Sequence, residues 1–331
     1  MRRLARPLLL LALAGLLAGC TLGTSPSLDV TTQVEDFGSN PGHLRMYKYV
    51  PAKLAPAPAM VVVLHHCFQR AYDYIEEAAW RPLADRYGFV ILAPEQVPYN
   101  ELNRCFSWYS SGQWRGKGEG ESIHQMIEKM AIDYKVDRNR IFVTGLSSGG
   151  SMAMAMLASY PDVFAGGSEI GGAPFGCATS FIDVPLCQTI GASKTPQEWG
   201  DLVRAASPHH GPWPVVSIWH GSNDLIAAPN DAKNLVMQWT NVHGLPNTPT
   251  RQDTVEGYPH YVYADASGRA VVEYYDVTGM GHSVPMDPGR GCGDGREGVG
   301  NFVSDRHICS SLYMLKFWGV VDAADSLAPG S

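Results

Sequence analysis

The 331-residue sequence predicts an α/β fold, a doubly wound and mostly parallel sheet with helices on both faces. Short, continuous apolar runs such as Met60–Leu64 and Phe89–Ala93 are typical of parallel strands that are buried on both faces. Segments with helical periodicity alternate with these runs, as expected for right-handed crossovers between parallel strands. The chain is 45% hydrophobic and long enough to bury one large core, and it shows no internal repeat and no domain linker after residue 30.

The predicted strands are short, rich in β-branched or aromatic residues, and bounded by turn-forming residues. In chain order they span Val30–Val34, Leu44–Val50, Met60–Leu64, Phe89–Ala93, Ile141–Thr144, Ala165–Ile170, Pro214–Trp219 and Ala270–Val277. The predicted helices carry apolar residues at helical spacing. They span Tyr74–Tyr87, Ser122–Tyr134, Met152–Tyr160, Pro196–Ala206, Ala232–His243 and Ser310–Trp318. In the first helix we expect Trp80 and Leu83 to face inward and Gly88 to cap the C-terminus.

The N-terminal residues have the pattern of a targeting segment. Three arginines precede an apolar run from Leu8 to Leu17, which is too short to span a membrane as a stable helix. The run ends in Leu17-Ala18-Gly19-Cys20, which resembles a bacterial lipobox; an ordinary secretory signal with a chance cysteine is the alternative. The resemblance implies cleavage before Cys20 and lipidation of that residue.

These boundaries define the expected organisation of the chain. We expect a lipoprotein signal peptide at 1–19, a flexible tether at 20–29, one α/β domain at 30–320 and a C-terminal tail at 321–331. The expected location is the bacterial envelope, with a lipid anchor at Cys20, or the periplasm or exterior. Thr21 is not the Asp that the resemblance associates with retention at the inner membrane, so the outer membrane is favoured.

Charge excludes some classes of partner. The formal net charge is −7, and residues 1–19 hold three of the 25 basic residues and no acid, which leaves 22 basic against 32 acidic residues, or −10. An acidic body without a basic cluster argues against nucleic acids and anionic lipid surfaces. We therefore expect contact with a membrane only through the lipid on Cys20.

The cysteine content also suits an exported protein. Seven cysteines minus a lipidated Cys20 leave six, which allow 15 pairings, so sequence alone does not assign them. Two pairs are local, Cys177–Cys187 and Cys292–Cys309, and this leaves Cys67–Cys105 by default. There is no Cys-x-x-Cys or His-x-x-x-His motif, so we predict neither a metal nor a cofactor.

The chemistry-bearing motif is Gly145-Leu146-Ser147-Ser148-Gly149, between a predicted strand and a predicted helix. In that context Gly-x-Ser-x-Gly indicates a nucleophile elbow, although a Gly/Ser-rich turn is the alternative. The glycines let strand and helix approach closely around a strained serine. Ser147 would then present its hydroxyl at a helix N-terminus, where free N–H groups favour developing negative charge.

An acid and a base are expected at the ends of later strands, because the carboxyl ends of parallel strands share one edge of the sheet. Asp224 follows the strand Pro214–Trp219; its alternative role is that of a turn residue, whereas Asp231 has the pattern of a helix N-cap. His282 follows Ala270–Val277, while His220 is expected to be structural. The order Ser147, Asp224, His282 is that of the α/β-hydrolases.

The oxyanion donors and the substrate cleft are predicted from position. A second donor should come from the loop after an early strand, so the backbone N–H groups of Cys67 and Ser148 are the candidates. His66, Trp108 and Trp219 are candidates for lining the cleft, although aromatic residues at such spacing are more often core. Residues 95–120 form a long loop, which is usually functional or tied by a disulfide.

Over most of its length the chain resembles the PHB depolymerase-type esterases, which are grouped with secreted feruloyl and acetyl xylan esterases. The resemblance is carried by the motifs Val62-Val63-Leu64-His65-His66-Cys67-Phe68-Gln69, Gly145-Leu146-Ser147-Ser148-Gly149-Gly150, Gly279-Met280-Gly281-His282, Cys309-Ser310-Ser311 and Phe317-Trp318-Gly319. It implies Ser147 as nucleophile, Asp224 as acid, His282 as base and the Cys67 amide as an oxyanion donor. His66 stands where the family usually has Gly; its Cβ restricts positive φ, so we expect altered loop geometry or substrate access there.

The predicted function is that of an exported, lipid-anchored serine esterase acting through an acyl-enzyme. We see no linker or second domain after Trp318, so short 3-hydroxyalkanoate esters or amorphous poly(3-hydroxyalkanoate) are expected as substrates. The alternative within enzymes is a feruloyl or acetyl xylan esterase. A non-catalytic binding lipoprotein is the hypothesis from a different class.

Overall fold

The computed structural model describes residues 31–189, 193–293 and 302–327. The expected signal peptide, the tether and the lipidation site at Cys20 lie outside the described residues. Among the residues that are described, no helix is long and apolar enough to cross a membrane.

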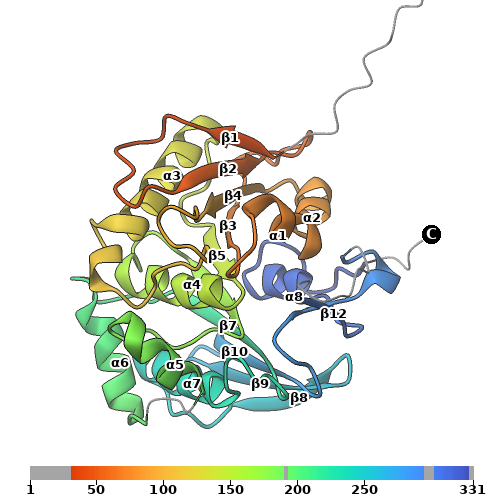
Figure 1. Cartoon of the computed structure of the whole chain (residues 1–331). Coiled ribbons are helices and arrows are strands. Elements are labelled where there is room, and N and C mark those ends of the chain that lie inside the picture. Colours follow the sequence, from red (N-terminus) through yellow and green to blue (C-terminus); the bar gives the residue numbers. More distant parts are fainter. Residues whose placement is uncertain (1–30, 190–192, 294–301, 328–331) are drawn as a thin grey trace, which may run out of the picture. The chain divides into compact units, whose positions relative to one another are not determined.

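A ten-stranded sheet forms the centre of the fold (Figure 1), with the order β1-β2-β4-β3-β5-β6-β7-β10-β9-β8. The six central strands, β4 to β10 in that order, are parallel, and the pairs at both edges are antiparallel. The strands are β1 Thr32–Val34, β2 Arg45–Tyr49, β3 Met60–Leu64, β4 Val90–Glu95, β5 Ile141–Gly145, β6 Gly166–Ile170, β7 Val215–Gly221, β8 Arg251–Val255, β9 Tyr258–Ala264 and β10 Ala270–Val277; β11 Val284–Met286 and β12 Val303–Asp305 form a second, two-stranded sheet. The predicted mostly parallel α/β sheet is confirmed.

Helices cover both faces of the sheet. They are α1 Ala71–Glu77, α2 Trp80–Tyr87, α3 Gly118–Tyr134, α4 Ser148–Ser159, α5 Val184–Thr189, α6 Pro196–Ala205, α7 Asn230–Val242 and α8 Ser310–Phe317. Residues of α3, α4, α6 and α7 belong to one buried cluster, and residues of α1, α2 and α8 belong to another. Alternate residues of β3 divide between the clusters, Val62 in the first and Val63 in the second, so the sheet separates two apolar layers.

One segment that was predicted to be a single helix forms two helices. The expected helix Tyr74–Tyr87 is broken into α1 and α2 at Ala79, which has a left-handed φ of 57°. Both Ile75 and Trp80 are buried, but five positions rotate an α-helix by about 140°, so a continuous helix could not turn both toward the sheet. The break lets each half bury its own apolar face. Trp80 and Leu83 are buried and Gly88 is the left-handed C-cap, as predicted.

The hairpin β8–β9 was not predicted. Strand β8 is Arg-Gln-Asp-Thr-Val and lies at the exposed edge of the sheet, so it has no apolar run to mark it. Its position matters for the surface described below, because it extends the sheet beyond the last parallel strand.

Candidate active site

Ser147 lies at the tip of a sharp turn between β5 and α4, as the motif predicts. Its backbone has φ 57° and ψ −121°, a strained conformation for a residue with a side chain, and its N–H donates to the carbonyl of Ile170 at 2.9 Å. A Cβ at Gly145 would lie 2.4 Å from the Gly149 carbonyl carbon, and one at Gly149 would lie 2.2 Å from the Leu64 oxygen. Neither position can carry a side chain, so the glycines are required by the close packing of the turn.

Asp224 and His282 form a buried hydrogen-bonded pair. His282 Nδ1 lies 2.7 Å from Asp224 Oδ2, and Asp224 Oδ1 accepts the N–H groups of Ile226 and Ala227 at 2.8 and 2.9 Å. Burial disfavours the charged carboxylate, but these hydrogen bonds outweigh it, and the pKa of Asp224 falls below its usual value. An ionised Asp224 places the imidazole proton on Nδ1 and leaves Nε2 as the proton acceptor.

Gly171 connects this pair to the serine turn. It directly follows Ile170, which holds the Ser147 N–H, and its own N–H donates to Trp219 at 3.0 Å. With φ 53°, it has no side chain to displace the pair: an ideal Cβ would lie 3.1 Å from both Asp224 Oδ2 and His282 Nδ1. Gly171 therefore permits the close approach of the two halves of the site.

We expect Gly171→Ala to reduce ester hydrolysis on the order of tenfold or more, because the added methyl displaces the imidazole and strains the backbone. The measurement is kcat for p-nitrophenyl butyrate, with thermal unfolding as the check on folding. Gly244→Ala is the matched control, since Gly244 also has a positive φ, 70°, and its Cβ would meet nothing within 4 Å. Equal losses in the two variants would mean that only backbone strain matters.

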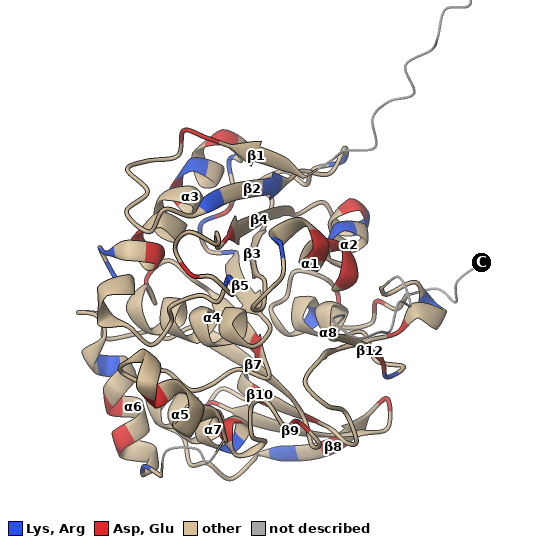
Figure 2. Cartoon of the chain, viewed as in Figure 1, with Lys and Arg blue, Asp and Glu red and all other residues tan. Residues whose placement is uncertain are grey.

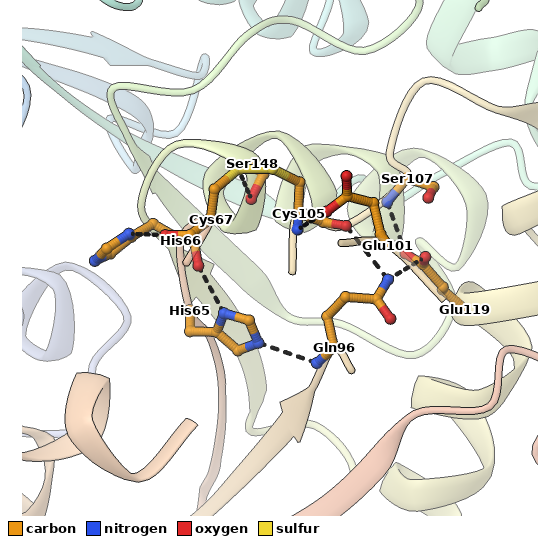
Figure 3. Close-up of a disulfide and its surroundings, with 9 residues drawn as sticks. All are labelled: His65, His66, Cys67, Gln96, Glu101, Cys105, Ser107, Glu119 and Ser148. Atoms are coloured by element: carbon orange, nitrogen blue, oxygen red, sulfur yellow. Dashed lines mark hydrogen bonds between the residues drawn. A yellow bond between two sulfur atoms is a disulfide. The ribbon is translucent and has the colours of Figure 1, made fainter. Parts of the chain in front are cut away.

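Cys67 and Ser148, the two predicted oxyanion donors, lie beside each other. The Cys67 sulfur is 3.3 Å from Ser148 Oγ and is bonded to Cys105 (Figure 3). The disulfide therefore ties the loop after β4 to the loop after β3. All three predicted disulfides are present: Cys67–Cys105, Cys177–Cys187 and Cys292–Cys309.

The side chain of His65 supports this loop through two hydrogen bonds. The Gln96 N–H donates to His65 Nε2 at 3.0 Å, so Nδ1 carries the proton and donates to the His66 carbonyl at 2.7 Å (Figure 3). Burial lowers the pKa of His65 to about 4, which keeps the ring neutral in this arrangement at neutral pH. The Gln96 side chain continues the network to Glu119 at 2.6 Å, and burial raises the pKa of Glu119 to about 7. Sequence reasoning missed this support.

His66 is buried where the loop after β3 approaches His282, the candidate catalytic base. Its ring lies 4.6 Å from that of Phe302, which in turn lies 5.8 Å from the His282 ring. Burial lowers the pKa of His66 to about 3. The residue with a left-handed backbone in this loop is Phe68, with φ 66°, and not His66.

The two tryptophans suggested for the cleft lie in the core. Trp219 has no exposed surface and stacks on Tyr275 at 3.8 Å between ring centres, so lining an open cleft is wrong for its side chain. Trp108 is also buried, edge-on to Tyr109. The ring of Phe302 lies near those of His66 and His282, and the sequence did not predict a residue from this part of the chain at the site.

Two further carboxyl groups lie behind Asp224. Glu169 and Asp231 are fully buried. The prediction of Asp231 as a helix N-cap is wrong, because Pro229 holds that position. Burial and the neighbouring Asp224 raise the pKa of Asp231 to about 8. Burial likewise raises the pKa of Glu169 well above its usual value, although the Gly172 N–H donates to it. At neutral pH Asp231 is therefore mainly protonated.

We expect Asp231→Asn to stabilise the protein at pH 7 and to have little effect near pH 4. In the unfolded chain Asp231 loses its proton near pH 3.8, whereas the folded state holds it up to about pH 8, so stability is lost as the pH rises between these values. Asparagine removes that loss, and a rise in melting temperature of at least about 3 °C is expected at pH 7. The measurement is calorimetric melting from pH 4 to pH 8; a difference independent of pH would contradict the assignment.

One group of potential metal ligands occurs in the described part of the chain. Asp287, Asp305 and His307 offer ligand atoms within 4.8 Å of one another. Arg290 forms an ion pair with Asp287, so an arginine already balances the charge of this carboxylate.

Comparison with known proteins places the chain in a family. The family model described as esterase PHB depolymerase matches residues 44–256, more than half of the chain. The chain belongs to the PHB depolymerase esterase family. It is an ester hydrolase with the α/β-hydrolase fold, as the sequence predicted.

Relatives in this esterase family are named for different activities. The chain is 44% identical over 303 residues to poly(3-hydroxyalkanoate) depolymerase C of Paucimonas lemoignei, covering 90% of this chain and 72% of the relative. It is 34% identical over 267 residues to feruloyl esterase B of Talaromyces funiculosus, covering 77% and 74%. The solved structure of an acetyl xylan esterase from Aspergillus awamori aligns with a TM-score of 0.74 at 27% identity, covering 88% of this chain and 99% of that one.

Proposed function

We propose that the protein hydrolyses poly(3-hydroxyalkanoate)-type polyesters, as short oligomers or amorphous polymer, with Ser147, Asp224 and His282 as the catalytic triad. The family membership supplies ester hydrolysis as the reaction. The observation that favours a polyester over a polysaccharide is an exposed apolar surface around the triad.

This surface, here called the apolar rim, consists of large hydrophobic side chains that are 48–94% exposed. They are Phe68, Leu102, Phe181, Ile182, Leu186, Leu225 and Ile226. Phe68 follows the oxyanion candidate Cys67, and Leu225 and Ile226 follow Asp224 directly. Exposed apolar patches of this kind mark binding sites for apolar partners.

Contacts between loops connect the members of the rim. The Phe68 N–H donates to Asn103 and the Ala228 N–H donates to Gln188, each at 2.6 Å, and the Phe181 ring lies 6.2 Å from Tyr109. The helix α4, which follows Ser147 directly, is buried, has no charged residue and is tan throughout in Figure 2. A polyester chain presents methyl and methylene groups with few hydrogen-bond donors, so it matches an apolar rim better than a hydroxyl-rich glycan does.

The proposed reaction has two steps. His282 Nε2 accepts the proton of Ser147 as its Oγ attacks the ester carbonyl, and the ionised Asp224 stabilises the imidazolium. The N–H groups of Ser148 and Cys67 bind the developing oxyanion. His282 then passes the proton to the oxygen of the departing alkoxide, which leaves as an alcohol. The same imidazole takes a proton from a water that attacks the acyl-enzyme, and it gives that proton to Ser147 Oγ as the acid is released.

We also propose that the chain is exported and lipid-anchored at Cys20. The three disulfides support an oxidising compartment, and the lipobox-like residues support the anchor. The mass of the mature N-terminal peptide tests this: a Cys20 lipidated on its thiol and amine is expected, and an unmodified N-terminus would contradict the anchor.

Replacing Ile182 and Leu225 together by Ser should slow hydrolysis of an amorphous poly(3-hydroxybutyrate) suspension at least about fivefold, because adsorption loses apolar area. The kcat/KM for soluble p-nitrophenyl butyrate should change less than twofold. Ile132→Ser is the matched control, since Ile132 is 71% exposed on α3, outside the rim.

The substrate class is tested by products from the wild-type protein. Release of 3-hydroxybutyrate from polymer is expected. If only ferulate or acetate were released, from feruloylated or acetylated xylan, the polysaccharide esterase would replace this proposal.

A further inference from the structure

A second binding surface lies on the part of the sheet that carries the unpredicted hairpin. A cavity of about 580 Å³ opens between α7 and strands β8, β9 and β10, in the lower part of Figure 1. None of the residues lining it belongs to the triad or the apolar rim. Its volume is within the range of small-molecule sites in proteins. We call this cavity the tyrosine groove.

The floor of the tyrosine groove is a row of side chains from three adjacent strands. Gln252, Tyr261 and Tyr274 are direct partners in the register of β8, β9 and β10, so they project from the same face. The rings of Tyr261 and Tyr274 are nearly parallel, at 14° with centres 5.6 Å apart. Tyr263 and Asp276 lie two residues further along their strands and so on the same face. The result is an aromatic floor, with the rings of Tyr261 and Tyr274 stacked, that is bordered by polar groups.

The polar groups of this groove are free to bind a ligand. In the described parts of the chain, the side chains of Gln252, Asn247, Asn230 and Asp276 make no hydrogen bond or ion pair, and the tyrosine hydroxyls have no hydrogen-bond partner. Asp276 Oδ1 is buried and unpartnered. Buried polar atoms are almost always paired, so an orphaned carboxylate oxygen in an open groove calls for an external donor.

We propose that the tyrosine groove binds a neutral polysaccharide chain. Flat tyrosine rings match the C–H face of a pyranose, and amide and carboxylate groups at their border match its hydroxyls. Asp276 requires a hydrogen-bond donor, which sugar hydroxyls supply and the ester groups of a polyester do not. One cation, Lys233, and one anion, Asp276, line the groove, so its formal charge is balanced and a neutral glycan is favoured.

This role is separate from ester hydrolysis. Asp276 pairs in register with His220, whose Nε2 is 3.6 Å from Asp224 Oδ2, so one end of the groove lies behind the triad on the same edge of the sheet. A glycan in the groove would hold the enzyme on a polysaccharide surface without occupying the space in front of Ser147.

The experiment titrates the protein with xylohexaose, cellohexaose and mannohexaose by isothermal titration calorimetry. At least one is expected to bind with a Kd in the range of about 0.01–1 mM. Tyr261→Ala and Tyr274→Ala should weaken that binding at least tenfold. Gln252→Ala and Asn247→Ala, at exposed positions with little risk to folding, should weaken it about threefold or more. Tyr47→Ala, on β2 at the opposite end of the sheet, should leave it unchanged.

All variants should hydrolyse p-nitrophenyl butyrate at the wild-type rate, which verifies folding and keeps this test separate from the proposed function. Absence of binding by all three glycans at 10 mM would overturn the proposal, as would equal binding by the groove variants and the wild type. A 3-hydroxybutyrate hexamer is titrated into the Ser147→Ala protein as the competing ligand. Loss of its binding on adding Tyr261→Ala would assign the groove to polyester instead.

Discussion

Ser147→Ala is expected to lower kcat for p-nitrophenyl butyrate by a factor on the order of 10⁵–10⁶. The alanine removes the only proposed nucleophile while the donors at Ser148 and Cys67 remain, so the residual rate reports what binding and the oxyanion site achieve alone. Folding should be unaffected, because the hydroxyl makes no hydrogen bond that supports the turn; the backbone N–H to Ile170 does so. The measurement is steady-state kinetics with unfolding curves for both proteins.

Ser159→Ala is the control, since Ser159 lies at the other end of the same helix and its hydroxyl donates to the Ala155 carbonyl within that helix. It should retain full activity. Substantial turnover by Ser147→Ala would require another nucleophile and would end the triad assignment.

Asp224→Asn is expected to lower kcat by a factor on the order of 10⁴ at neutral pH. The amide retains the shape of the carboxylate, but its NH₂ group can face His282 and favour the wrong tautomer. It also removes the charge that stabilises the imidazolium. The loss should appear in kcat with little change in KM, which pre-steady-state acylation rates would confirm.

Asp231→Asn supplies the matched comparison, because it makes the same chemical change at a buried aspartate near Asp224. Asp231 is mainly protonated at pH 7, so the amide resembles the native group and activity should be kept. A loss at Asp231 as large as that at Asp224 would show that the carboxylate cluster as a whole, and not one hydrogen bond to His282, supports the reaction.

Much of this site could be predicted from the sequence because its members follow strands that the sequence marks clearly. Ser147 and His282 each stand in a glycine-rich turn after an apolar run, and Asp224 follows a third run, so one topological rule brings them to one edge. The Asp224–His282 bond agrees with that expectation. The end of a strand is marked by neighbouring residues in the sequence, so it can be recognised without knowledge of the tertiary structure.

Contacts across space were not predictable in the same way. Phe302 meets His66 across more than 200 residues, and Gly171 meets the Asp224–His282 pair through its lack of a side chain; neither leaves a local signal. The prediction for Trp219 was wrong because a position at the end of a strand shows how far along the strand a residue lies. It does not show toward which face of the sheet the side chain points. Its neighbour His220 points to the Asp224 side, and alternation turns Trp219 toward Tyr275.

The central claim, that Ser147 is the acyl-enzyme nucleophile, is tested most directly by labelling with a fluorophosphonate probe. Active protein is treated with the probe and its peptides are mapped by mass spectrometry. One adduct is expected, on the peptide that contains Ser147, with loss of activity in proportion to labelling and no adduct in Ser147→Ala. Complete inactivation with the adduct on another residue, or full activity with Ser147 unlabelled, would contradict the account.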